Sequence, residues 1–258
     1  MALAPTDFPT TGTALVVGGS GGIGRQVCLA LARAGCDVAL TYHRNRDAAV
    51  EVARSIEGMG RQAHIAALTL EDAEAVKRHV DAMASRFGAI HSVVYAAGPP
   101  IRMAPIRALT PEGWASAVRA DAMGCFNLVW ASLPHLKESR GAIVAVITSA
   151  VERVPSHDIL SAAPKAAVEM LIRGVAKEEG RNGIRANCVG PGWIDDGLGR
   201  EVMETQMDDG RIERIRSSIP LRRFGQAAEV AQAVLFLLSA KAAFVTGQSL
   251  AVDGGGQL

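Results

Sequence analysis

Tyrosine and cysteine are both scarce in this sequence. Only two of the 258 residues are tyrosines, Tyr42 and Tyr95, which limits where a phenolic acid could lie. The four cysteines (Cys28, Cys36, Cys125 and Cys188) show no paired spacing that would bind a metal, and each lies in an apolar context. We therefore expect buried free thiols in a reducing compartment, and no metal site.

Net charge and long apolar runs are lacking as well. The net charge is +1, with Lys and Arg scattered along the chain, so no basic patch indicates nucleic acid or an anionic membrane as a partner. No apolar run approaches membrane-spanning length, and the first residues lack the basic and apolar parts of a secretion signal. The sequence therefore predicts a cytoplasmic protein with no nucleic-acid and no membrane partner.

What the chain does have is a regular alternation of apolar strands and helices. With 49% hydrophobic residues, the chain suffices for one α/β domain over residues 1–258, with an extension at about 1–12. Continuously apolar strands alternating with helices indicate a doubly wound parallel sheet with helices on both faces. The expected strands are 13–17, 38–42, 63–68, 92–97, 142–147 and 184–189, and the expected helices are 25–34, 46–56, 73–87, 111–133, 161–179 and 227–238.

A glycine-rich turn follows the first strand and opens the first helix. It contains Gly18, Ser20, Gly22, Ile23 and Gly24. Glycines let the backbone approach a pyrophosphate, and free N–H groups at a helix N-terminus bind its charge. The turn therefore predicts a dinucleotide site; the alternative is a tight strand–helix turn with incidental glycines.

The end of the second strand indicates which dinucleotide binds. NAD sites usually place Asp or Glu there for the ribose 2′-hydroxyl, whereas this strand ends in Tyr42-His43-Arg44-Asn45. The planar fork of Arg44 suits a 2′-phosphate, with His43 and Asn45 as further donors. We therefore expect NADP(H); the alternative is that Arg44 is a solvated surface residue.

A serine and a lysine follow the apolar strand 142–147. Ser149 comes directly after this strand, and Lys165 lies on the next helix. An open α/β sheet builds its reaction centre in this way, at the carboxyl ends of its strands.

Several motifs, in order, resemble the short-chain dehydrogenase/reductase family, and most closely the 3-oxoacyl-[acyl-carrier-protein] reductases. Residues 42–45 also resemble the pteridine reductases. The resemblance implies a single Rossmann domain with a seven-stranded sheet in the order 3-2-1-4-5-6-7, a homotetramer or dimer packed through the long central helices, and a mobile substrate lid at 197–218. The motifs are Gly18-x-x-x-Gly22-x-Gly24, Ala96-Ala97-Gly98, Ser149, Lys165, Pro191-Gly192, Val245-Thr246-Gly247 and Asp253-Gly254-Gly255.

The resemblance also implies roles for individual residues. In such enzymes a tyrosine four residues before the lysine protonates the substrate oxygen, and the lysine binds the ribose and lowers the tyrosine pKa. The serine holds the substrate oxygen, and an asparagine on the preceding helix anchors a water relay. Cofactor contacts are expected from the glycine turn, from 43–45, and from Leu70, Ala96, Ala97, Gly98, Lys165, Pro191, Gly192 and Ile194.

The chemical end of this pattern is altered. The tyrosine position is Ser161 and the asparagine position is Asp121, while Tyr95, Thr69 and Asp196 replace other residues that relatives use around the cofactor. An aliphatic hydroxyl is far too weak an acid to replace a phenol. Loss of a positioned general acid typically costs about 10²–10⁴-fold in rate, so another group is needed for ordinary ketone reduction.

Three residues offer substitutes or explanations. His157, in the loop before the helix, could donate a proton, or it could be a solvated loop residue. Asp121 could pair with Lys165, act as a desolvated general base, or form an ion pair without chemistry. Because Pro164 disfavours helical geometry before it, the helix could begin late, and Ser161 would then serve only as a cap.

These observations support three hypotheses for function. The first is an NADP(H)-dependent oxidoreductase that reduces a carbonyl, such as an acyl thioester or a small ketone, with a non-standard proton donor. The second is a cyclase, dehydratase or isomerase that uses Asp121, Lys165 or His157 on the same scaffold. The third is a non-catalytic nucleotide-binding protein.

Overall fold

A seven-stranded parallel sheet forms the centre of the computed structural model, which describes residues 7–258. The strand order is β3-β2-β1-β4-β5-β6-β7, which confirms the doubly wound Rossmann fold. Half of the extension expected at 1–12 lies outside the described residues. The strands are β1 (Thr13–Val17), β2 (Asp37–Tyr42), β3 (Ala63–Ala67), β4 (Ile90–Tyr95), β5 (Ala142–Val146), β6 (Arg185–Pro191) and β7 (Ser249–Val252).

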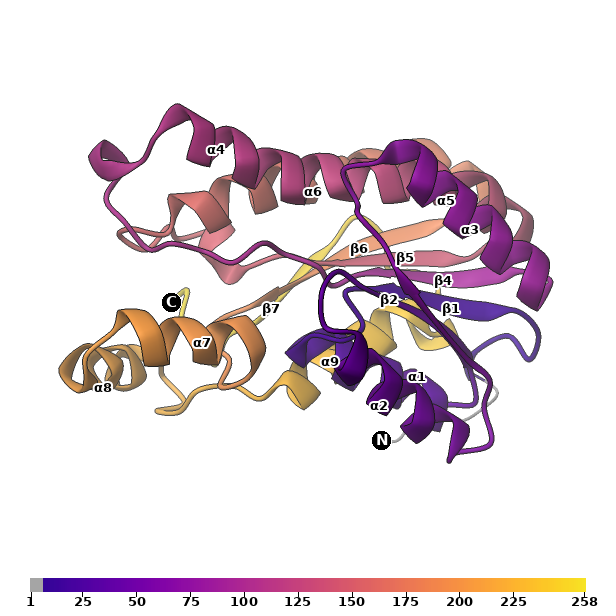
Figure 1. Cartoon of the computed structure of the whole chain (residues 1–258), viewed down its shortest axis with the longest axis horizontal. Helices are drawn as coiled ribbons and strands as arrows, with labels where there is room; N and C mark the ends of the chain where they lie inside the picture. Colours follow the sequence, from indigo (N-terminus) through magenta and orange to yellow (C-terminus); the bar gives the residue numbers. More distant parts are fainter. Residues whose placement is uncertain (1–6) are drawn as a thin grey trace.

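Helices cover both faces of this sheet (Figure 1). Along β1, Ala14 and Val16 pack into one core with α1, α2 and α9, whereas Leu15 and Val17 pack into a second core with α3, α5 and α6. This alternation follows from the two-residue period of a strand whose faces are both buried. The helices are α1 (Gly22–Arg33), α2 (Arg46–Glu57), α3 (Ala73–Phe87), α4 (Pro111–Val118), α5 (Gly124–Ser139), α6 (Ile159–Glu179), α7 (Gly197–Gln206), α8 (Asp209–Ser218) and α9 (Ala227–Leu238).

The long helix expected at 111–133 is longer than predicted and is interrupted. A π-helical segment, η3 (Arg119–Met123), joins α4 to α5, and α5 continues through Pro134 to Ser139. Such π segments are often found at functional sites. This one carries the buried Asp121.

The late start expected for the helix around Ser161 is wrong. Helix α6 begins at Ile159, with Asp158 as its cap residue, and Ser161 is inside its first turn. Pro164 is accommodated within the helix near its N-terminal end. Because a proline there removes only one intrahelical hydrogen bond, the helix continues through it.

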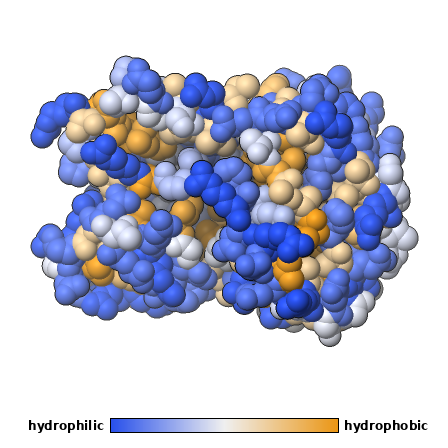
Figure 2. Space-filling model, viewed as in Figure 1, coloured by the Kyte–Doolittle hydropathy of each residue, from blue (hydrophilic) through white to orange (hydrophobic). Residues whose placement is uncertain are grey.

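The segment predicted to be a lid forms two helices, α7 and α8. The side chain of Gln206, at the end of α7, accepts a hydrogen bond from Met103 N (2.9 Å) and donates one to Ile101 O (2.8 Å). These bonds tie α7 to the segment that follows β4. Figure 2 shows this face of the molecule hollowed beside α7 and α8. Within residues 7–258, no helix has the length and apolar character needed to cross a membrane.

Candidate active site

The glycine turn is packed so closely against other backbone atoms that it has no room for side chains at two of its positions. Gly18 has φ +80°, and a Cβ there would lie 2.7 Å from the carbonyl oxygen of Ala96. A Cβ on Gly24 would lie 2.1 Å from the carbonyl oxygen of Gly18. Both positions therefore require glycine, because any side chain would collide with backbone.

The first turn of α1 presents positive partial charge to this glycine turn. The helix begins at Gly22 after Gly21, whose position provides no side-chain cap, and its first turn carries no acidic residue. Unpaired N–H groups and the helix dipole together favour an anion at such a terminus. Ser20 and Ile23 flank it, both half-buried. The fit to the diphosphate of a dinucleotide is therefore good at this end of the cleft.

The residues after β2 lie beside the same turn. Gly19 N donates to Thr41 O (2.9 Å), which holds the turn against the end of β2. His43 and Arg44 follow and are exposed. Asn45 caps α2, because its Oδ1 accepts a hydrogen bond from Ala48 N (3.1 Å). The described residues thus give a free cation, Arg44, where a 2′-phosphate would need one.

Asp196 lies at a position where the family resemblance implies a threonine. It caps α7 by accepting from Gly197 N (2.7 Å), and its Oδ1 is 2.9 Å from where a Cβ on Gly22 would be. A carboxylate therefore lies against the N-terminus of α1. Its charge opposes that of a diphosphate bound there.

The remaining predicted cofactor residues line the carboxyl edge of the sheet. Ala96, Ala97 and Gly98 follow β4, and a Cβ on Gly98 would be 4.0 Å from Lys165 Nζ and 3.9 Å from Leu198 Cδ1 of α7. Leu70 follows β3, and its carbonyl accepts from Asn127 Nδ2 (2.8 Å). The end of β6 supplies Pro191, Gly192 and Ile194.

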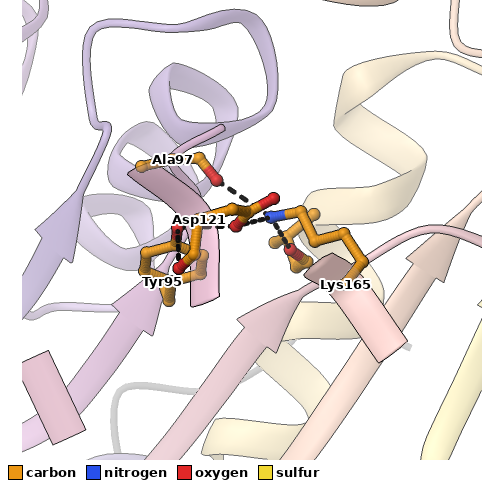
Figure 3. A network of polar contacts seen from close by, with 5 residues as sticks. Tyr95, Ala97, Asp121 and Lys165 are labelled. Carbon is orange, nitrogen blue, oxygen red and sulfur yellow. Dashed lines mark hydrogen bonds and ion pairs between the residues drawn. The ribbon is translucent and has the colours of Figure 1, made fainter. Parts of the chain in front are cut away.

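Lys165 is the centre of a buried polar network (Figure 3). Its ammonium donates to Ala97 O (3.0 Å) and Val146 O (3.0 Å) and pairs with Asp121 Oδ1 (2.9 Å). An ammonium group has three N–H donors, so all of them are engaged within the protein. The ion pair between Asp121 and Lys165 that the sequence suggested is thus present. A ligand oxygen that binds Lys165 must replace one of these partners.

Tyr95 completes the network and was not predicted to take part in it. Its hydroxyl donates to Asp121 Oδ1 (2.7 Å) and lies 3.0 Å from Asp121 O, and Lys165 Nζ is 4.7 Å from its ring centre. Burial, followed by the charge of Asp121, raises the pKa of Tyr95 well above its usual value. This phenol is therefore no substitute for the missing acid. Its position at the end of β4, among residues that depart from the family pattern, was the available signal.

Comparison with known proteins agrees with this geometry. A family profile described as enoyl-(acyl carrier protein) reductase matches residues 17–257. The chain is 35% identical to the uncharacterized oxidoreductase YgfF of Escherichia coli over 94% of its length and 98% of that protein. It is 32% identical to the 3-oxoacyl-[acyl-carrier-protein] reductase FabG of Staphylococcus aureus, over 95% of this chain and 98% of that one. This chain belongs to the short-chain dehydrogenase/reductase family.

Two further relatives of this short-chain dehydrogenase/reductase bear on its ligands. The peroxisomal 2,4-dienoyl-CoA reductase SPS19 of Saccharomyces cerevisiae is 32% identical over 94% of this chain and 82% of that one. A short chain dehydrogenase from Burkholderia cenocepacia, solved in complex with NADP, superposes with a TM-score of 0.88 at 30% identity, and the match covers 100% of both chains. A nicotinamide cofactor is therefore supported.

The predicted catalytic residues of this dehydrogenase/reductase differ in how far they are exposed to solvent. Ser149 is half-buried at the start of η4 (Ser149–Val151), three residues after the last residue of β5. Ser161 is buried on α6, one turn before Lys165. His157 is exposed, with φ +74°. The neighbouring Asp158 is half-buried, and burial raises the pKa of its carboxyl group to about 6.

Proposed function

We propose that this protein is an NADP(H)-dependent reductase that acts on a carbonyl group, with a 3-oxoacyl thioester or a similar ketone as substrate. One observation carries the choice of cofactor: the end of β2 offers the exposed Arg44 and no carboxylate, beside a backbone cradle for a diphosphate. The relative FabG, named as a 3-oxoacyl-[acyl-carrier-protein] reductase, supports the choice of substrate.

The chain's own residues divide the work of such a reaction. The bound nicotinamide supplies a hydride. The first turn of α1 holds the diphosphate and Arg44 the 2′-phosphate, each through charge-assisted hydrogen bonds. Ser149 orients the substrate oxygen through a hydrogen bond. The ion pair of Lys165 and Asp121 lies below that oxygen in the cleft. Helices α7 and α8 exclude water, which strengthens every polar contact inside.

A second candidate is the reduction of a carbon–carbon double bond conjugated to a thioester. Two points favour it: Ser161 stands where the family resemblance implies the phenol used in ketone reduction, and the similar proteins include a 2,4-dienoyl-CoA reductase. In that reaction the hydride adds to carbon and the electrons move to the thioester oxygen as an enolate. An enolate oxygen can be stabilised by hydrogen bonds from weak acids, whereas an alkoxide has to be protonated by a stronger acid.

We also propose that the protein assembles as a homo-oligomer through α4, α5 and α6. Large apolar side chains on these helices are exposed: Trp114 (41%), Phe126 (48%), Trp130 (44%) and Met170 (64%). Exposed apolar groups of this size mark interaction surfaces. Light scattering after gel filtration tests the assembly, and a mass of one chain at micromolar concentration would refute it.

Loss of reduced-nicotinamide absorbance tests the proposed reaction. Purified protein is incubated with NADPH and, separately, a 3-oxoacyl thioester, a small diketone, a pterin and a 2,4-dienoyl thioester. We expect steady oxidation with a carbonyl substrate, and a preference for NADPH over NADH. Oxidation with the dienoyl thioester alone would establish the second candidate.

The other hypotheses predict different results in the same assay. A cyclase, dehydratase or isomerase would bind NADPH without oxidising it while it converts substrate. A non-catalytic nucleotide-binding protein would bind NADPH and convert none of the substrates. If NADPH does not bind, the proposed choice of cofactor is wrong, and only the assignment to the family remains.

A further inference from the structure

We propose that Gln206 is a positioning residue for the reduction: its side-chain amide fixes α7 to the segment that follows β4 and so keeps α7 beside the reaction centre. This assignment rests on the proposed function. It follows from the two hydrogen bonds of this amide, from the contacts at the other end of α7, and from the way in which the segment after β4 is anchored.

The Gln206 amide uses both of its polar atoms on one short stretch of backbone. Its Nε2 donates to Ile101 O (2.8 Å), and its Oε1 accepts from Met103 N (2.9 Å). The reverse orientation of the amide would place its NH₂ group against the N–H of Met103, so only one orientation satisfies both partners. We call these two bonds the amide clamp. Because both partners are backbone groups, the clamp fixes the position of the end of α7 relative to this segment.

The opposite end of α7 lies at the cleft. Asp196, the cap residue of α7, has its Oδ1 2.9 Å from the position of a Cβ on Gly22, at the start of α1. In the first turn of α7, Leu198 Cδ1 is 3.9 Å from the position of a Cβ on Gly98, and that position is 4.0 Å from Lys165 Nζ. Helix α7 therefore extends from the glycine turn, past the site of Lys165, to the amide clamp.

The segment that receives the clamp is anchored in turn to the loop before α6. Ala104 N, next to the clamped residues, donates to His157 O (3.1 Å). Helix α8 adds a weaker contact, because Arg211 Nη2 lies 4.0 Å from Met103 Sδ. The helix that follows His157 carries both Ser161 and Lys165. The clamp thus joins α7, through a few residues of backbone, to the helix that bears the chemical end of the cleft.

The clamp has the properties of a contact that opens and closes during turnover. Gln206 is exposed, and a single hydrogen bond at such a position contributes little net free energy. The clamp can therefore open without the unfolding of α7, which is held by its buried Val202 and Met203. With the clamp closed, α7 restricts the exit of bound nucleotide and substrate and keeps water out of the cleft.

The first arm of the test needs neither substrate nor nucleotide. Hydrogen exchange followed by NMR reports on the Met103 N–H, which the clamp protects directly. We expect Gln206→Leu to exchange this amide about tenfold faster than the wild type. The matched control is Gln232→Leu, the same change at an exposed position of α9. Equal exchange rates for Gln206→Leu and Gln232→Leu would overturn the assignment.

The second arm measures release of the nucleotide. Bound NADPH is displaced by excess NADP⁺ in a stopped-flow instrument, and its fluorescence reports the release rate. We expect Gln206→Leu to release NADPH about tenfold faster than the wild type, with Gln206→Glu, which keeps the acceptor for Met103 N, between the two. A release rate of Gln206→Leu equal to that of Gln232→Leu would refute a role of the clamp at the cleft.

The third arm distinguishes positioning from a role in stability alone. With NADPH and whichever substrate of the panel is turned over, we expect Gln206→Leu to raise the KM of that substrate about tenfold. We expect kcat to change by less than about threefold, because the clamp touches no reacting atom. A loss of folded protein would instead lower kcat and leave KM unchanged, and that result would contradict the assignment.

The outcomes separate the two proposals. If the wild type oxidises no NADPH with any substrate, the proposed function fails, and the role of Gln206 in that reaction fails with it. If the wild type turns over and Gln206→Leu keeps the wild-type release rate and KM, the assignment alone fails.

Discussion

The nucleotide end of the cleft is built from backbone, whereas its chemical end is built from buried side chains. Around Gly18 and Gly24 the shape is set by atoms that no substitution can remove. Around Lys165 it is set by one ammonium, one carboxylate and one phenol, which bond to each other and to three backbone carbonyls. A site lined by backbone atoms keeps its shape when nearby side chains are replaced. In a buried charge network, the replacement of one residue leaves its partners without their ion pair or hydrogen bond.

This difference explains where the chain departs from its family. The family resemblance implies other residues at the positions of Asp121 and Tyr95, and the structure shows these two side chains in one network with Lys165. At the nucleotide end the family resemblance implies other residues at Thr69 and Asp196, whereas the glycines of the turn match the family motif. Four predictions follow in order of the expected effect of a single side chain, from the largest to the smallest; three test this contrast, and one tests a region outside both ends.

Lys165→Met tests whether the chemical end acts as a unit. The substitution leaves Asp121 buried without its ion-pair partner, so we expect the free energy of unfolding to fall by about 3–5 kcal/mol. Urea denaturation followed by circular dichroism measures it. The exposed Lys137→Met on α5 is the control, with a change below about 0.5 kcal/mol. Equal stabilities for the two variants would contradict the role of the network.

Acidification tests a region outside both ends. Burial lowers the pKa of His79 and of His91 to about 4, and the Nε2 of each is buried without a hydrogen-bond partner. Between pH 6.5 and 4 the unfolded chain therefore binds protons that the folded chain does not. Stability is complete above pH 6.5 and falls as the pH drops, by on the order of 3 kcal/mol per histidine.

Urea midpoints at pH 7 and pH 5 measure this loss. His79→Gln is expected to lose less stability on acidification than the wild type, whereas the exposed His43→Gln keeps the wild-type dependence. A pH dependence that His79→Gln leaves unaltered would refute the assignment to this residue.

Arg44→Ala tests the nucleotide end. Loss of a charge-assisted contact to the 2′-phosphate costs about 1.5–3 kcal/mol, so we expect NADPH to bind at least about tenfold more weakly, with NADH little affected. Isothermal titration calorimetry gives both constants. Arg46→Ala, an exposed arginine two residues on, is the matched control. An equal loss for NADPH and NADH would show that Arg44 does not read the 2′-phosphate.

Asp196→Thr has the smallest expected effect and the opposite sign. Removing a carboxylate from beside the N-terminus of α1 favours a bound diphosphate, by about 1 kcal/mol. The NADPH dissociation constant is therefore expected to fall about fivefold, and the gain to shrink at high salt. Asp195→Thr, which removes the adjacent carboxylate that pairs with Arg200, is the control. Weaker binding by Asp196→Thr would show that the carboxylate helps to hold the nucleotide.

The sequence was sufficient for the parts of the molecule that depend on local rules. The alternation of strands and helices and the glycine turn were predicted because periodicity and backbone sterics act over a few neighbouring residues. The chemical end was predicted only in part. Asp121 and Lys165 were identified as a possible pair, but the bond from Tyr95 joins β4 to the π segment, and no local pattern reports such a contact.

Two further differences have physical reasons. The local preference of the residue before Pro164 predicts a late start of α6, whereas the packed helix begins at Ile159 and tolerates the one hydrogen bond that Pro164 removes. His157, one of the predicted substitute acids, is exposed on a left-handed backbone, and the sequence does not specify that conformation.

NADPH oxidation by the wild-type protein with the substrate panel tests the central claim most directly, that this chain keeps a nucleotide site built from backbone and acts as a reductase despite its altered chemical end. The account predicts that NADPH binds, that it is oxidised steadily with at least one substrate of the panel, and that NADH is a poorer reductant. NADPH that binds but is oxidised with no substrate would contradict the account.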